Sequence, residues 1–170
     1  MRKMVVEIRN RRIGGGWIIF GTFVLAAIFT VLPMPRWLES YRPEWVALVV
    51  IYWVMALPHR VGLVTAWIAG FFLDVLEGSL LGMNALALAL VAYLALSLYQ
   101  RMRMFTAVQQ SSTVLILVGI HQLLAFWVLT ANNQNTAPNL IFMISALSSA
   151  IVWPFVFLSL RYLRRSFQVS

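Results

Sequence analysis

Two acidic residues, Asp74 and Glu77, stand in a stretch of the sequence that is otherwise apolar and rich in glycine, from Gly70 to Leu90. Three residues apart, they would lie on one face of a helix. A carboxylate at membrane depth is costly and marks a candidate functional site. The structural alternative is that Asp74 reaches the interface or accepts hydrogen bonds at the N-terminus of the next helix. Glu77 is most simply solvated. Two carboxylates without further oxygen ligands indicate no metal site, and we predict no cofactor.

Three further polar residues interrupt apolar segments. Asn84 could line the same outer cavity as Asp74, or bond to the preceding turn. His121 and Gln122 lie near the centre of another apolar run, where a polar pair more often bonds to a neighbouring helix than to a ligand. The candidate ligand-pocket residues are therefore Asp74, Glu77, Asn84, His121 and Gln122.

Small residues recur at intervals of four around Asp74. On a helix this spacing gives a narrow stripe that lets a second backbone approach closely. The stripe is a candidate for helix packing or for a partner interface. Its members, with those of the preceding turns, are Gly62, Ala66, Gly70, Gly78 and Gly82.

The composition assigns the whole chain to the membrane. It has 170 residues, of which 62% are hydrophobic and only 11% charged, too few polar residues to cover a soluble globule. The net charge of +8 lies in short clusters between long apolar runs, a distribution typical of membrane topology and not of nucleic-acid binding. The chain contains no cysteine, so it offers neither disulfides nor thiol chemistry.

The apolar runs predict an all-α bundle of six transmembrane helices in a single domain. A basic arm (1–14) precedes the first span and a basic tail (161–170) follows the last. Pro33 and Pro35 end the first span, and Ser79 is a plausible N-cap of the fourth. The predicted spans are about 15–34, 44–58, 61–77, 80–100, 107–131 and 138–160.

Basic residues predict the orientation of this bundle. With six spans, all but two of the 13 Lys and Arg residues fall on one side; the exceptions are Arg36 and Arg42. The positive-inside rule therefore predicts that both termini are cytoplasmic and that the Glu77–Ser79 turn faces outward. His59, Arg60 and Arg101 are candidate cytoplasmic contacts, although the simpler interpretation of His59 and Arg60 is that they are only determinants of orientation. No catalytic motif is found, so an enzyme is disfavoured.

Several segments together resemble one family. They include RPEWVALVVIYWVMALPHRVG (42–62), GFFLDVLEGSLLGMNALAL (70–88), the turn Tyr99 to Arg101, and WPFVFLSLRYLRRSF (153–167). The combination of RPxW, ALPHR and LDxxxGSxLG is similar to MreD, the rod-shape-determining protein family of the bacterial inner membrane. The likeness covers about residues 33–167, and Gly70, Asp74, Gly78 and Gly82 match the glycine-aspartate signature of the family.

The resemblance implies a scaffold in the cell-elongation machinery (the elongasome) that supports lateral peptidoglycan synthesis. Its implied partners are the single-span protein MreC, the MreB filament system, the polymerase RodA and the elongation transpeptidase, together with membrane lipids; a homodimer stays open. The family is also similar in fold to the substrate-binding subunits of energy-coupling-factor transporters, which implies an outward-facing cavity. The alternative function is therefore a small-molecule or lipid-precursor binding subunit. In those transporter subunits, small residues spaced by four on the first helix dock the energising module. Here the first helix offers Gly21 but no Ala-xxx-Ala pair, which counts against transport.

Overall fold

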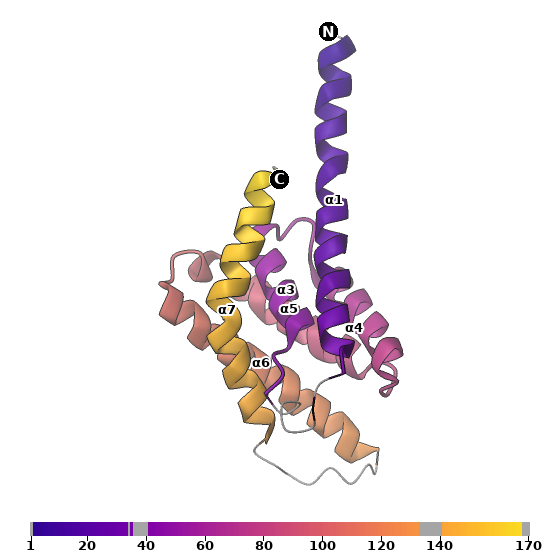
Figure 1. The fold of residues 1–170 in the computed structure, drawn as a ribbon, viewed down its shortest axis with the longest axis vertical. Helices are drawn as coiled ribbons and strands as arrows, with labels where there is room; N and C mark the ends of the chain where they lie inside the picture. The colour runs from indigo at the N-terminus through magenta and orange to yellow at the C-terminus, as the bar shows by residue number, and fades with distance from the viewer. Residues whose placement is uncertain (1, 34, 36–40, 133–140, 168–170) are drawn as a thin grey trace.

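The computed structural model describes residues 2–33, 35, 41–132 and 141–167, and these residues form six α-helices (Figure 1). The predicted all-helical architecture is thus confirmed. The helices are α1 (Arg2–Val31), α3 (Trp45–Ala56), α4 (Leu63–Glu77), α5 (Met83–Met102), α6 (Ala107–Ala131) and α7 (Ile141–Ser166).

Helix α3 is the centre of the bundle. Every residue from Val46 to Met55 is buried, and the helix packs against α1, α5 and α7. A helix that is apolar all round is expected in such a central position. Its 12 residues span only about 18 Å, at 1.5 Å per residue. Because other helices surround it, this short helix need not match the full thickness of a bilayer.

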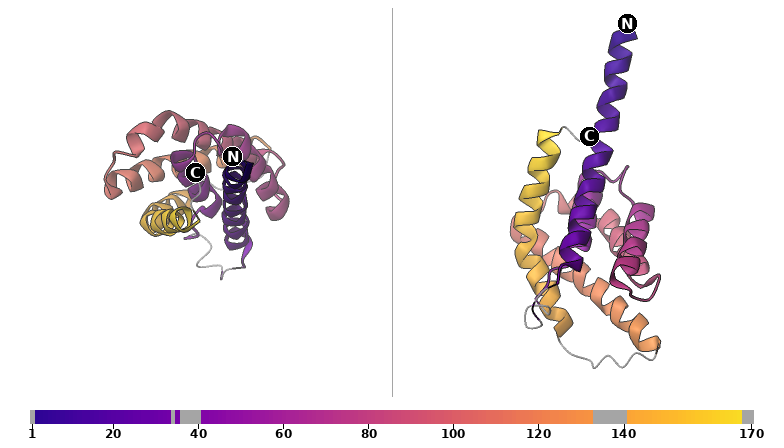
Figure 2. Two further views of the ribbon diagram at one scale, coloured as in Figure 1. Left: turned by 90° about the horizontal axis from the view of Figure 1, so that it is seen from above. Right: turned by 45° about the vertical axis from the view of Figure 1, so that its right-hand side comes forward.

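The remaining helices pack in sequence order around α3. The closest pairs are α4 with α5, α6 with α7, and α5 with α6. The start of α1 and the end of α7 lie at the same end of the bundle, and α1 projects well beyond its neighbours there (Figures 1 and 2). This arrangement agrees with an even number of crossings.

Large apolar side chains cover the outside of the bundle. Trp67 on α4, Trp127 on α6 and Phe155 on α7 are between 50% and 75% exposed. Three helical segments, Met83–Met102, Ala107–Ala131 and Met143–Ser166, are long and apolar enough to cross a membrane, and two shorter apolar segments are Gly15–Val31 and Trp45–Ala56. That all six helices are crossings stays a prediction.

Three helices have boundaries that differ from the predicted spans, and one of them is α7, which ends at Ser166 and not near residue 160. Helix α1 begins at Arg2, so the predicted arm (1–14) and the first span form one continuous helix through the Gly14–Gly16 run. Helix α5 begins at Met83 and not near residue 80, because the preceding turn occupies residues 78–82. The start predicted for the sixth span, near residue 138, lies outside the described residues; α7 is described from Ile141 and continues through Pro154 to Ser166.

Candidate functional site

The Asp74 carboxylate joins the end of α4 to the start of α5. The residue is fully buried. Its Oδ1 accepts hydrogen bonds from the Ser79 hydroxyl and the Asn84 backbone N–H, both at 2.9 Å. Its Oδ2 accepts from the backbone N–H groups of Gly82 at 2.9 Å and Ala85 at 3.3 Å. These N–H groups lie at the start of α5. There the backbone N–H groups have no carbonyl acceptor within the helix, and the helix end carries a partial positive charge. Asp74 therefore caps α5 from the preceding helix.

Two glycines shape the turn that brings Asp74 to α5. Gly78 ends α4 with φ of +65°, and Gly82 precedes α5 with φ of +98°. Residues with a Cβ rarely adopt these left-handed conformations. The prediction that Ser79 is the N-cap was wrong: Gly82 occupies that position, and the Ser79 side chain donates to Asp74.

At Gly70 the backbones of α4 and α5 approach closely. A Cβ added to Gly70 would lie 2.5 Å from both the Ala85 Cα and the Asn84 carbonyl oxygen, so the backbones could not keep their present separation. Ala66, one turn earlier on the stripe, is also fully buried. Gly62 precedes α4 with open space around its Cα position, so it takes no part in this close approach.

Glu77 and Asn84 form a second link across the same turn. The Asn84 side-chain amide donates to Glu77 Oε2 at 3.0 Å. Asn84 is buried, whereas Glu77 is exposed at the end of α4. The structure thus brings together three of the five ligand-pocket candidates, Asp74, Glu77 and Asn84, and uses their polar atoms largely on one another and on the α5 backbone.

Gln122 belongs to a separate polar cluster that joins α3, α6 and α7. Its amide donates to Glu44 Oε1 at 2.6 Å and to the Ser145 hydroxyl at 3.2 Å. Ser149 completes the link by accepting a hydrogen bond from the Glu44 backbone N–H at 2.9 Å. Gln122 therefore bonds to neighbouring helices, the simpler of the two interpretations of its sequence position.

His121, beside Gln122 in sequence, is buried with 3% of its surface exposed. Neither ring nitrogen has a hydrogen-bond partner among the described residues. The two neighbours thus differ: Gln122 belongs to a hydrogen-bond network, whereas the His121 ring is buried without a hydrogen bond among the described residues.

The cluster of α3, α6 and α7 also contains Glu44, Ser145 and Ser149, which were not predicted from the sequence as site residues. Ser145 and Ser149 are four residues apart in an apolar helix, a spacing that places both hydroxyls on one face and was the available signal.

The cytoplasmic-contact candidates are exposed. His59 and Arg60 lie in the turn between α3 and α4, and Arg101 lies in the last turn of α5. The basic residue that contacts α3 is instead Arg103. Its Nε donates to the Met55 carbonyl at 3.0 Å and its Nη2 to the Ala56 carbonyl at 3.1 Å, so it caps the C-terminus of α3.

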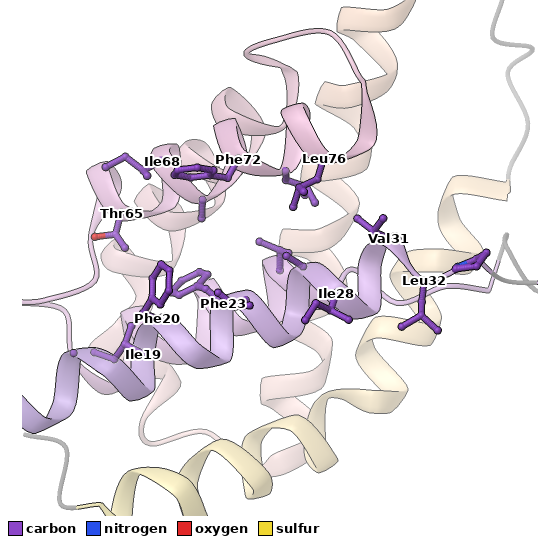
Figure 3. Close-up of a pocket in the computed structure, with 17 residues that line it drawn as sticks. Ile19, Phe20, Phe23, Ile28, Val31, Leu32, Thr65, Ile68, Phe72 and Leu76 are labelled. Carbon is purple, nitrogen blue, oxygen red and sulfur yellow. The ribbon is translucent and has the colours of Figure 1, made fainter.

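An apolar groove of about 730 Å³ runs between α1 and α4 (Figure 3). Residues of α1 from Gly16 to Val31 and of α4 from Thr65 to Leu76 line it, with Leu32, Pro33 and Val46. Among the described lining residues, Thr65 alone has a polar side chain. We call this feature the α1–α4 groove. Elsewhere in the described ranges, no group of three or more His, Cys, Asp or Glu side chains is placed to hold a metal ion.

Comparison with known proteins identifies the family. Residues 10–163 match the family described as rod shape-determining protein MreD. The chain belongs to the MreD family. A curated relative, the rod shape-determining protein MreD of Haemophilus influenzae, is 33% identical over 151 residues, which cover 86% of this chain and 90% of the relative.

Membership of the MreD family supports a role in determining rod shape. Together with the three long apolar helices, it also indicates a membrane protein. No solved structure matches the chain. The likeness in fold to energy-coupling-factor subunits therefore stays a prediction for this MreD-family chain.

Proposed function

We propose that the chain is a non-enzymatic scaffold of the bacterial inner membrane that holds the transmembrane helix of MreC and thereby supports lateral peptidoglycan synthesis. MreB, RodA and the elongation transpeptidase would be further members of the same complex. Both termini would lie in the cytoplasm, as the distribution of Lys and Arg predicts. The observation that carries the proposal is the α1–α4 groove, in a chain of the MreD family.

The length of the groove suits a membrane-spanning helix. Its α1 wall from Gly16 to Val31 measures about 23 Å, at 1.5 Å per residue. This length approaches the roughly 30 Å of a bilayer hydrocarbon core. An occupant would therefore lie alongside α1 and α4 over most of the membrane thickness.

The walls of the groove carry side chains that are available for contact. Phe20 and Phe72 are 62% and 63% exposed, one on each wall, and their side chains border the space between the helices (Figure 3). Helix α1 packs mainly against α3 and only sparsely against α4, which leaves the groove open. Helices associate in lipid through such van der Waals packing, so a second apolar helix is a suitable occupant.

The chemistry of the two sites disfavours the alternative of a small-molecule or lipid-precursor subunit. A polar ligand needs placed polar groups to fix it. Of the described residues that line the groove, Thr65 alone offers a polar side chain, and the Asp74 carboxylate already accepts four hydrogen bonds within the α4–α5 turn. Recruiting Asp74 to a ligand would leave the N-terminus of α5 without its cap.

Co-purification of MreC tests the proposal. We expect the double substitution Phe20→Ser and Phe72→Ser to reduce the MreC recovered with the chain several-fold, because two apolar contacts with the partner helix are lost. Phe155→Ser is the matched control, since Phe155 is 73% exposed on α7 and does not line the groove. Equal MreC recovery from the groove variant and the control would contradict the proposal.

A further inference from the structure

A second cavity, of about 470 Å³, lies at the end of the bundle where α7 ends. It shares no lining residue with the α1–α4 groove. Four arginines contribute to its wall: Arg103, Arg161, Arg164 and Arg165. We call it the arginine cavity.

The arginines converge from two different elements. Arg103 follows α5 and is held by the Met55 and Ala56 carbonyls at the C-terminus of α3. Arg161, Arg164 and Arg165 come from the last turns of α7 at spacings of three and four, which place them on one helix face. All three are close enough to Tyr52 on α3 for their charges to act on its hydroxyl. The α7 arginines thus face α3 and Arg103 across the cavity.

Among the residues that the structure describes, no acid compensates this positive charge at the cavity wall. None of the lining residues is acidic, and within the described ranges none of the four arginines forms an ion pair. Gln110 adds a polar group to the wall, and its amide donates to the Met102 carbonyl at 3.0 Å. Guanidinium groups gathered in this way match the geometry and charge of a phosphate.

The rest of the wall is apolar. Met55, Leu57 and Phe157 line the cavity, and the Arg161 guanidinium lies 6.0 Å from the centroid of the Phe157 ring. The cavity thus combines an arginine cluster with an apolar surface at the ends of apolar helices, the level at which lipid headgroups meet the hydrocarbon. Basic pockets between transmembrane helices bind anionic headgroups in this way.

We propose that the arginine cavity binds the phosphate of an anionic phospholipid, with the apolar wall contacting the first part of its acyl chains. The arginine cavity is separate from the α1–α4 groove. It would fix the ends of α3, α5 and α7 relative to one another and to the membrane surface.

Lipid retention by the purified full-length chain tests the site. Native mass spectrometry would follow binding of added phosphatidylglycerol, with phosphatidylcholine and inorganic phosphate as separate probes. We expect Arg161→Gln with Arg164→Gln to weaken phosphatidylglycerol binding roughly thirtyfold, the effect of two charges near a membrane surface. Arg60→Gln with Arg101→Gln is the control, because it removes the same charge from exposed residues that do not line the cavity, and it should change binding less than twofold.

If both double variants lost the same amount of phosphatidylglycerol binding, the proposal would be overturned, because general surface charge would then explain the binding. If inorganic phosphate competed as well as the lipid, the assignment to a phospholipid would be overturned. If a synthetic acidic peptide displaced the lipid at a lower concentration, the cavity would be assigned to a protein partner instead. A photoreactive phosphatidylglycerol would show where the lipid binds on the unsubstituted chain. Labelling should concentrate on residues 52–57 and 157–165, and even labelling of all helices would contradict the site.

Discussion

At the scale of single residues, the chemistry of the acidic stretch is that of a helix junction. The Asp74 carboxylate has four donors, three of them backbone N–H groups at the start of α5. A buried carboxylate is tolerated where its hydrogen bonds are satisfied in this way. The sequence allowed both a structural and a ligand-binding interpretation of Asp74, and the structure gives the detailed form of the structural one.

Asp74→Asn should destabilise the protein. The amide presents two N–H donors to groups that are themselves donors, so at least one N–H group of the junction loses its acceptor. We expect a loss of about 1.5–3 kcal/mol, typical of hydrogen bonds to charged groups, measured as a lower Tm in detergent. Glu77→Gln is the control, because its amide oxygen can still accept from Asn84. An unchanged Tm for Asp74→Asn would show that the Asp74 carboxylate does not stabilise the protein by capping α5.

Gly70→Ala should also destabilise the protein, because the new methyl group would lie 2.5 Å from the Ala85 Cα and the Asn84 carbonyl oxygen, well inside van der Waals contact. Overpacking of this kind costs about 1–3 kcal/mol. Gly21→Ala on α1 is the matched control, since a Cβ at Gly21 meets nothing within 4 Å. The same Tm for both variants would show that α4 and α5 can separate at no cost.

At the scale of elements, hydrophobic runs and breakers predicted the helices well and their ends less well. The apolar pattern indicates each helix, since burial and lipid both select apolar residues. The start of α5 was placed too early because the turn extends from Gly78 to Gly82, and a serine after a glycine resembles an N-cap. The cap comes from Asp74, on the previous helix, and local sequence rules do not identify a cap donated from a distance.

The polar cluster of α3, α6 and α7 could not be assembled from one sequence. Glu44 and Gln122 are 78 positions apart, and Ser145 is a further 23 positions along the chain. Only the three-dimensional packing of the helices brings the start of α3 next to α6 and α7, where these side chains meet. The sequence indicated that Gln122 would bond to a neighbouring helix, but it did not identify the helix or the residue.

Gln122→Leu should loosen this three-helix contact. Hydrogen bonds between membrane helices contribute about 0.6–1.7 kcal/mol, and Glu44 would lose its side-chain donor. We expect a lower Tm and a partial recovery when Glu44→Gln is added, because the neutral side chain costs less to leave unpaired. Gln100→Leu is the control: Gln100 is exposed and bonds only to the adjacent Tyr99. A control variant that loses as much stability would contradict the interhelical role.

At the scale of the whole molecule, the distribution of charge predicts how the bundle sits in the membrane. The start of α1 and the end of α7 lie at one end of the bundle (Figure 1). Eleven of the 13 Lys and Arg residues belong to that predicted side, which the positive-inside rule assigns to the cytoplasm. The packing of helices into a bundle with an open α1–α4 groove was not predictable, because apolar runs do not say which of their faces meet lipid.

Cysteine labelling tests the orientation directly, because the chain has no cysteine of its own. We expect Asn132→Cys, exposed at the end of α6, to react with a membrane-impermeant maleimide in spheroplasts. His59→Cys, exposed in the α3–α4 turn, should react only after the membrane is opened. The reverse pattern would place both termini outside.

Site-specific photocrosslinking in living cells tests our proposal that the α1–α4 groove holds the transmembrane helix of MreC. A photoreactive benzoylphenylalanine would replace Phe20 or Phe72 in the groove, and Tyr93 on α5 or Ile116 on α6 as controls that are 60% and 63% exposed. We predict crosslinks to MreC from both groove positions and none from the controls. Crosslinks to MreC from Tyr93 or Ile116, with none from the groove, would contradict the account.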